Sequence, residues 1–145
     1  MKITAVDYRR ILDLAAAAYP AECCGLLVGV ESEAGDWTVT RLVPAANVAP
    51  EEPSHSARDR FEVDPQIRID LERELRDQEE NVIGHYHSHP DYPAVPSATD
   101  LAKAYEPSLC WVIASVMTGK ASELAAFRLF EDRFVSVALE VLDEC

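Results

Sequence analysis

The sequence contains no hydrophobic run close to the roughly 18 residues that a membrane-spanning helix needs. Its first residues, Met1-Lys2-Ile3-Thr4, do not form the pattern of a signal peptide. Repeats, low-complexity tracts and linkers long enough to divide the chain are also missing. These absences predict a soluble, cytoplasmic protein without a membrane partner.

Lysine is scarce, and acidic residues outnumber basic ones. Lysine and arginine together number 13, against 26 aspartate and glutamate residues, so the net charge is −13. A surface of this sign repels phosphate groups, so we expect neither a nucleic-acid partner nor an anionic membrane. Because an excess of carboxylates over lysines can also reflect a salt-rich cytoplasm, the charge does not by itself identify a substrate.

The four cysteines, at positions 23, 24, 110 and 145, lack the spacing of a disulfide framework. Cys23 and Cys24 are neighbours, and Cys110 lies inside an apolar run, so we expect reduced and mainly structural thiols. A thiol protease would need a histidine positioned beside the cysteine and a lowered thiol pKa. The sequence specifies neither of these features.

The chain length of 145 residues fits a single domain, since about 150 residues per domain is the usual expectation. A chain of this size buries roughly two-thirds of its unfolded surface and needs neither disulfides nor metal to form a core. Hydrophobic residues make up 48% and charged residues 27%, which is an ordinary globular composition. We therefore predict one domain over residues 1–145.

Hydrophobic periodicity and cap signals predict alternating helices and strands. A helix is expected between the capping residue Thr4 and Tyr19-Pro20, and another begins at Asp64-Pro65. The expected helices end near residues 19, 80 and 105, and the expected strands are 24–30, 37–43, 81–87, 109–116, 123–130 and 134–142. The segments 44–60 and 88–96 are expected to be loops. This order predicts an α/β fold, with a mixed sheet flanked by helices.

The segment around His87-Ser88-His89-Pro90 carries the clearest chemical signal. On an extended chain, residues i and i+2 point the same way, with Cα atoms roughly 7 Å apart, so His87 and His89 can converge on one ion. Asp100, at the start of the following helix, can supply a third ligand, and Ser97 lies on the same helical face. Two histidines and one carboxylate with an open fourth position make up a hydrolytic zinc site.

A hydrolytic zinc site also needs a general base that is not itself a ligand. Glu22 is the candidate, because it lies between the end of the first helix and the buried strand that begins at Cys24. Ser97 and Asp100 also have the spacing of a helix capping box, which is compatible with a catalytic role. His85 shares the strand face of His87, and we interpret it as a residue that lines the site.

Together, Glu22, the His87-Ser88-His89-Pro90 segment, Ser97 and Asp100 form a specific pattern with fixed spacing. The sequence closely resembles the JAMM (MPN-plus) metalloproteases, and in particular their small single-domain bacterial and archaeal members. The segment from Pro20 to Gly29 resembles the prokaryotic version of the glutamate region. Phe61-x-x-Asp64-Pro65 resembles the approach to the second helix of that family, so the resemblance covers about residues 1–140.

This resemblance implies a cytidine-deaminase-like α/β fold around one zinc ion per chain. It implies that His87, His89 and Asp100 are metal ligands, that Glu22 activates water, and that Ser97 stabilises the oxyanion. Family members hydrolyse peptide or isopeptide bonds after the C-terminal Gly-Gly of ubiquitin-like proteins, and prokaryotic relatives act on ubiquitin-like sulfur carriers. The expected partner is therefore a ubiquitin-like or sulfur-carrier protein with a C-terminal Gly-Gly.

Other functions are compatible with parts of this pattern. A non-catalytic MPN interaction scaffold typically lacks one or more ligands, whereas every ligand position is filled here. An iron oxygenase also uses two histidines and a carboxylate, but commonly in a different order along the chain. A nucleoside deaminase would need a Pro-Cys-x-x-Cys segment, which this sequence does not contain. A metal hydrolase with an unrelated small substrate is a further alternative.

Overall fold

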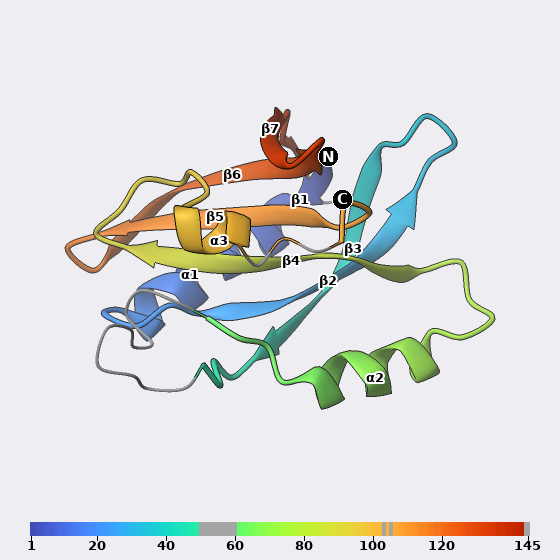
Figure 1. Ribbon diagram of the computed structural model, residues 1–145, viewed down its shortest axis with the longest axis horizontal. Helices are drawn as coiled ribbons and strands as arrows, with labels where there is room; N and C mark the ends of the chain where they lie inside the picture. Colours follow the sequence, from blue (N-terminus) through green and yellow to red (C-terminus); the bar gives the residue numbers. More distant parts are fainter. Residues whose placement is uncertain (50–60, 103, 105, 144–145) are drawn as a thin grey trace.

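The computed structural model describes residues 1–49, 61–102, 104 and 106–143, and it contains an eight-stranded mixed sheet (Figure 1). The strand order is β7-β6-β5-β4-β2-β3-β1-β8. The strands are β1 (Lys2–Thr4), β2 (Cys24–Glu31), β3 (Trp37–Ala45), β4 (Asn81–Pro90), β5 (Cys110–Met117), β6 (Lys120–Phe130), β7 (Arg133–Val137) and β8 (Glu140–Leu142). The helices are α1 (Ala5–Ala18), α2 (Pro65–Glu74) and α3 (Ala98–Ala102).

Helix α1 covers one face of the sheet and lies behind it in Figure 1. Its inward residues Ile11, Leu12 and Ala15 are buried against apolar side chains of the central strands. The helix begins as predicted, because the Thr4 side chain accepts a hydrogen bond from the Asp7 amide at 3.1 Å. This face of the sheet holds the largest part of the hydrophobic core.

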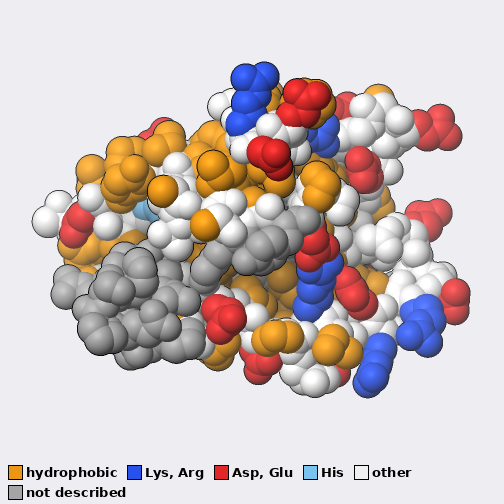
Figure 2. Space-filling view, viewed as in Figure 1, with side chains coloured by type: hydrophobic (Ala, Val, Ile, Leu, Met, Phe, Trp, Pro, Cys, Tyr) orange, Lys and Arg blue, Asp and Glu red, His pale blue; other side chains and the backbone are white. Residues whose placement is uncertain are grey.

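The opposite face carries α2 and α3 (Figure 1). Leu71 and Leu75 pack against Leu26 and Val28 of β2, which attaches α2 to the sheet. The N-terminus of α2 is capped by Asp64, whose side chain accepts a hydrogen bond from the Gln66 amide at 3.0 Å. Figure 2 shows charged side chains around α2, whereas hydrophobic side chains gather at the other end of this face, near α3 and β6.

The predicted α/β class is confirmed, but several boundaries differ from those expected. Strand β4 runs on to Pro90 instead of ending at His87, because Ser88 and His89 pair with β5 in parallel. Helix α2 ends at Glu74 and not near residue 80. Leu75 is its last inward apolar side chain, and Asp77 then takes a positive φ of 67°, which ends a right-handed helix.

The ends of the chain also differ from the expectation. Lys2–Thr4 forms the short strand β1, which pairs in parallel with β3 and β8. The expected strand 134–142 is divided into β7 and β8, which lie at opposite edges of the sheet. Most of the expected loop 44–60, namely residues 50–60, lies outside the described residues. In the described part of the chain, no helix is long and apolar enough to cross a membrane.

Gly84 allows β4 and β5 to approach closely just before the histidines of β4. A Cβ atom at this position would lie far inside van der Waals contact with the carbonyl oxygen and the Sγ atom of Cys110. We predict that Gly84→Ala lowers the free energy of unfolding by about 1–3 kcal/mol, because the backbones of β4 and β5 must move apart. Urea denaturation checks this, with the exposed Ser122→Ala as a control that changes stability by less than about 0.5 kcal/mol.

Candidate metal centre

Strand β4 carries three histidines, His85, His87 and His89, at alternate positions on the face that also holds α3. The ring centroids of His87 and His89 are 4.9 Å apart, and those of His85 and His87 are 6.2 Å apart. His87 is fully buried and His89 is 5% exposed. The extended backbone of β4 therefore places the three imidazole rings in a row along one face of the strand.

Asp100 of α3 closes on two of these histidines. The Nε2 atoms of His87 and His89 are 3.1 Å apart. The Oδ1 atom of Asp100 lies 3.3 Å from Nε2 of His87, and its Oδ2 atom lies 3.0 Å from Nε2 of His89. Two imidazole nitrogens and both oxygens of one carboxylate, from two separate elements, thus meet in a buried position.

This spacing fits a tetrahedral metal ion. Zinc binds histidine nitrogen and carboxylate oxygen at about 2.0–2.2 Å, so neighbouring ligands of a tetrahedral ion are about 3.3 Å apart. The two Nε2 atoms are 3.1 Å apart, and each lies near one oxygen of Asp100, at 3.3 Å for His87 and 3.0 Å for His89. The donor set of two imidazoles and one carboxylate is also one that zinc accepts.

Hydrogen bonding orients the His89 ring for ligation. Its Nδ1 atom lies 3.0 Å from the carbonyl oxygen of Pro93, which can only accept a hydrogen bond. Nδ1 therefore carries the hydrogen, and the lone pair of a neutral imidazole is on Nε2, the atom that faces His87 and Asp100. A carbonyl that holds the second nitrogen in this way is a common feature of histidine metal ligands.

The charges in the cluster compensate one another. Burial lowers the pKa of His87. For His89, burial opposes protonation, but hydrogen bonds with Asp100 and with the Pro93 carbonyl raise the pKa. For Asp100, burial acts in the opposite direction, yet the two histidines and the Ser97 amide hold the pKa of the carboxyl well below its usual range. The buried carboxylate therefore needs positive charge beside it, which a bound cation can supply.

Glu22 lies beside the two histidines, in the connection between α1 and β2. It is 5% exposed, and one of its carboxylate oxygens lies within 4.8 Å of one nitrogen of His87 and one of His89. By distance alone, Glu22 also qualifies as a metal ligand. Asp100 lies 3.0 and 3.3 Å from the two rings, so the histidines have one carboxylate beside them from α3 and another from the connection between α1 and β2.

Two polar residues fix the position of Glu22. The Cys23 amide donates to Oγ of Ser88 at 2.8 Å, and the Ser88 amide donates to the Cys23 carbonyl at 3.1 Å. Asn47 donates from Nδ2 to the Glu22 carbonyl oxygen at 3.2 Å. Ser88, which lies between the two histidines in sequence, therefore points to the other face and holds the segment that carries Glu22.

Ser97 is both the helix cap and a wall of a cavity. Its amide donates to Oδ2 of Asp100 at 2.8 Å, and its Oγ accepts from the Asp100 amide at 3.0 Å, which is the expected capping box. Ser97 also lines a cavity of about 290 Å³ together with Glu22, His89 and Tyr92. The hydroxyl can still donate its own hydrogen toward a group in this cavity.

The segment from Asp91 to Pro93, which holds His89, is itself anchored. Ser115 of β5 donates from Oγ to the Tyr92 carbonyl oxygen at 2.8 Å. Asp91 has a positive φ of 54° and accepts a hydrogen bond from the Thr118 amide at 2.7 Å. These contacts place the Pro93 carbonyl where it meets Nδ1 of His89.

The sequence singled out Glu22, His87, His89, Ser97 and Asp100, and the structure brings all five into one cluster. It did not single out the residues that hold them in place: Ser88, Pro93, Asn47 and Ser115. Only Ser88 had a recognisable signal, since strand alternation places it on the face opposite the histidines. The other contacts depend on which strands and loops meet.

The cysteines do not have the properties of nucleophiles. Burial raises the pKa of the Cys23 thiol, and it raises that of Cys24 to about 12. Cys23, Cys24 and Cys110 are free thiols among the described residues. A thiolate is required for nucleophilic attack, so the structural interpretation of these residues fits their surroundings.

Comparison with known proteins identifies the family. Residues 4–130, most of the chain, match the family of prokaryotic homologues of the JAB domain. The chain belongs to this family. The resemblance to JAMM (MPN-plus) proteins that the sequence motifs indicated is thereby confirmed.

Relatives of known name agree with this assignment. A desampylase from Haloferax volcanii is 39% identical over 101 residues, which cover 70% of this chain and 67% of the relative. A CysO-cysteine peptidase from Mycobacterium bovis is 28% identical over 126 residues, which cover 87% and 80%. A JAB1/MPN domain protein from Archaeoglobus fulgidus shares the fold, with a TM-score of 0.60 at 20% identity and coverage of 98% and 99%. The predicted fold class and enzyme class, a JAMM-type metallopeptidase, are confirmed.

We predict that Ser115→Ala lowers the affinity for a divalent metal roughly tenfold, because the Tyr92–Pro93 segment then holds His89 less firmly. Titration with Co²⁺, whose absorption spectrum reports on the ligand geometry, measures this change. The matched control is Ser136→Ala on β7, which is exposed. Unchanged Co²⁺ affinity in Ser115→Ala would show that the anchored segment does not position His89.

Proposed function

We propose that the chain is a zinc-dependent peptidase or isopeptidase that cleaves after the C-terminal Gly-Gly of a ubiquitin-like or sulfur-carrier protein. The observation that carries this proposal is the buried cluster of His87, His89 and Asp100, with Glu22 beside it at the edge of a cavity. A non-catalytic scaffold has no need for such a cluster. A cytoplasmic location remains a prediction from the sequence.

In this proposal, His87 and His89 would hold a zinc ion through their imidazoles, and Asp100 would hold it through its carboxylate. Zinc supplies a Lewis acid that polarises the scissile carbonyl and makes water more acidic. Glu22 takes a proton from the attacking water and delivers it to the leaving nitrogen. Ser97 donates a hydrogen bond from its hydroxyl to the oxygen that becomes negatively charged. Glu22, His89 and Ser97 line the same cavity.

The relatives support the substrate class. One relative is named a desampylase and another a CysO-cysteine peptidase. Both names are those of enzymes that act on a small protein or on a group attached to it. A Gly-Gly tail is thin and extended, and it can approach a buried metal that bulkier residues could not reach. The sequence-based expectation that the 44–60 loop helps to wall the groove falls largely on residues 50–60, outside the described residues.

The metal content tests the ligand assignment. The purified protein is expected to carry about one zinc ion per chain, and His87→Ala, His89→Ala or Asp100→Ala should each reduce this occupancy. The control is His85→Ala, because His85 lies in the same row but outside the three-residue cluster. Wild-type zinc affinity in the His87/His89 double variant, measured by competition with a chelator, would contradict the assignment.

Glu22→Gln separates metal binding from chemistry. This variant should keep its zinc, because Glu22 is not a proposed ligand, and it should lose hydrolysis by at least about 100-fold, because no base remains. The assay follows, by mass spectrometry, a ubiquitin-like carrier extended beyond Gly-Gly, with the exposed Glu79→Gln as control. Loss of zinc from Glu22→Gln would make Glu22 a ligand, and full activity would remove it from the mechanism.

A further inference from the structure

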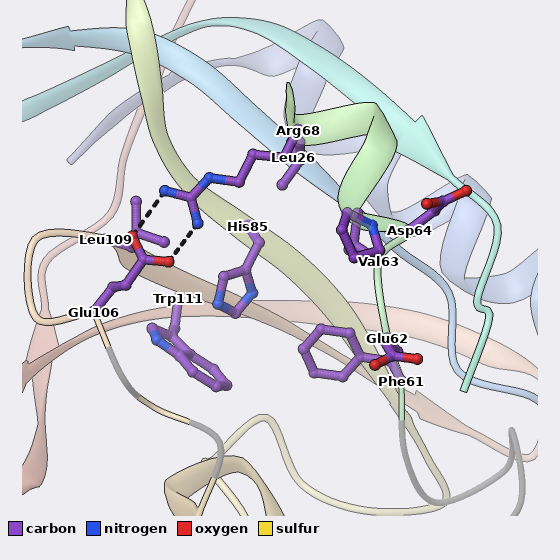
Figure 3. A pocket seen from close by; sticks show the side chains of 11 residues that line it. Leu26, Phe61, Glu62, Val63, Asp64, Arg68, His85, Glu106, Leu109 and Trp111 are labelled. Carbon is purple, nitrogen blue, oxygen red and sulfur yellow. Dashed lines mark hydrogen bonds and ion pairs between the residues drawn. The ribbon is translucent and has the colours of Figure 1, made fainter. Parts of the chain in front are cut away.

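A second, larger cavity lies at the other end of the histidine row. It has a volume of about 450 Å³, which is enough for a large side chain or a short peptide segment. Figure 3 shows the His85 ring near its centre, between the rings of Trp111 and Phe61. Leu26, Val63 and Leu109 complete walls that are mainly apolar. None of the proposed metal ligands or catalytic residues lines this cavity.

His85, which lines this cavity, also has an unpaired polar atom. Its Nδ1 atom is buried and has no hydrogen-bond partner in the part of the chain that the structure describes. The ring is held edge-on to Trp111, with centroids 4.2 Å apart, and lies 5.6 Å from Phe61. Buried polar atoms in folded proteins almost always have a partner, so the unpaired Nδ1 atom is a feature of the cavity wall that the described residues do not explain.

An ion pair forms one wall of this cavity. Arg68 of α2 binds both carboxylate oxygens of Glu106, with Nη2 and Oε2 2.7 Å apart (Figure 3). Figure 3 also shows the carboxylates of Glu62 and Asp64 directed away from the centre of the cavity. A charged group that entered among the apolar walls would lose its hydration without gaining an ionic partner there, so the cavity favours an uncharged side chain.

We propose that this cavity binds the side chain of the residue immediately before the Gly-Gly of the substrate, and that it selects a bulky, uncharged side chain. The inference rests on the proposed function and adds a specificity site to it. His85 precedes His87 by two residues, a distance of roughly 7 Å along the strand. Two extended glycines span the same distance. A tail that lies alongside β4 and is cleaved at the metal centre therefore brings the residue before Gly-Gly to His85.

The position of Phe61 favours glycine at the last two positions of the substrate tail before the scissile bond. Its ring stacks on His87, with centroids 4.2 Å apart and an interplanar angle of 16°, between the cavity and the metal centre. A peptide that crosses this stack passes over a flat aromatic surface that leaves little room for side chains. The first residue beyond the stack with a side chain then meets the 450 Å³ cavity.

The test uses one ubiquitin-like carrier with tails X-Gly-Gly and a fixed extension, where X is Leu, Phe, Ala, Asp or Lys. With the zinc-loaded enzyme, we expect kcat/KM to be at least about tenfold higher for Leu and Phe than for Ala, Asp or Lys. Val63→Phe, which fills the cavity, should bring the ratio of Leu to Ala close to one. Val6→Phe, on the exposed surface of α1, should leave this ratio unchanged.

A binding measurement gives a readout that does not depend on turnover. Peptides ending in X-Gly-Gly are titrated into the Glu22→Gln protein, and the indole N–H signals of its two tryptophans are followed by NMR. Trp111 lines the cavity and should shift most with X as Leu or Phe. Trp37, buried in the core on the α1 side, should not shift and serves as an internal control.

The outcomes separate the two proposals. Equal cleavage for all five tails would overturn the specificity site and leave the proposed function intact. An effect of Val63→Phe on the choice of residue after the scissile bond would also overturn it, because the cavity would then bind the leaving side. If no carrier were cleaved, the proposed function would fail. The chemical shifts of Trp111 would then test the cavity on their own. Shifts that depend on X would support side-chain binding in the cavity, and equal shifts for every X would refute it.

Discussion

The position of β4 between β2 and β5 is the constraint on which the site depends. Pairing with β2 as far as His87 and with β5 as far as Pro90 keeps β4 extended, so alternation directs the histidines to one face and Ser88 to the other. The same pairing brings Cys23 against Ser88 and therefore Glu22 against the histidines. Strand β4 thus presents both candidate histidine ligands and also holds the segment that carries the candidate base.

Buried polar groups in this region are costly unless they have partners, and the structure supplies most of these partners from the protein itself. The Pro93 carbonyl, the Ser97 amide and Asn47 each satisfy one polar group of the cluster or its support. The exceptions are informative. Nδ1 of His85 and of His87 have no hydrogen-bond partner within the described residues. The His87 ring lies against Phe61 beside the proposed metal site, and the His85 ring lines the second cavity.

The sequence alone was sufficient for the α/β class, which follows from local periodicity, and for His87 and His89, which follow from strand alternation. Glu22 lies far from the histidines in the chain, and it was singled out together with Ser97 and Asp100 by the pattern that resembles the JAMM family. The capping box of Ser97 and Asp100 is observed, but by itself it does not distinguish a helix start from a metal ligand. The supports contributed by Asn47 and Ser115 depend on contacts between distant segments, which no local pattern encodes. The end of α2 was also missed, since neither glycine nor proline marks it and Asp77 ends the helix through its positive φ.

X-ray absorption at the zinc edge of the zinc-loaded protein reports directly on the proposed ligands. We expect a first shell of nitrogen and oxygen at about 2.0–2.2 Å, with two imidazoles, and the same shell in Glu22→Gln. A sulfur ligand at about 2.3 Å would place a cysteine on the metal and contradict the account. A protein ligand lost in Glu22→Gln would contradict it as well, because Glu22 would then bind the metal and could not be the separate base.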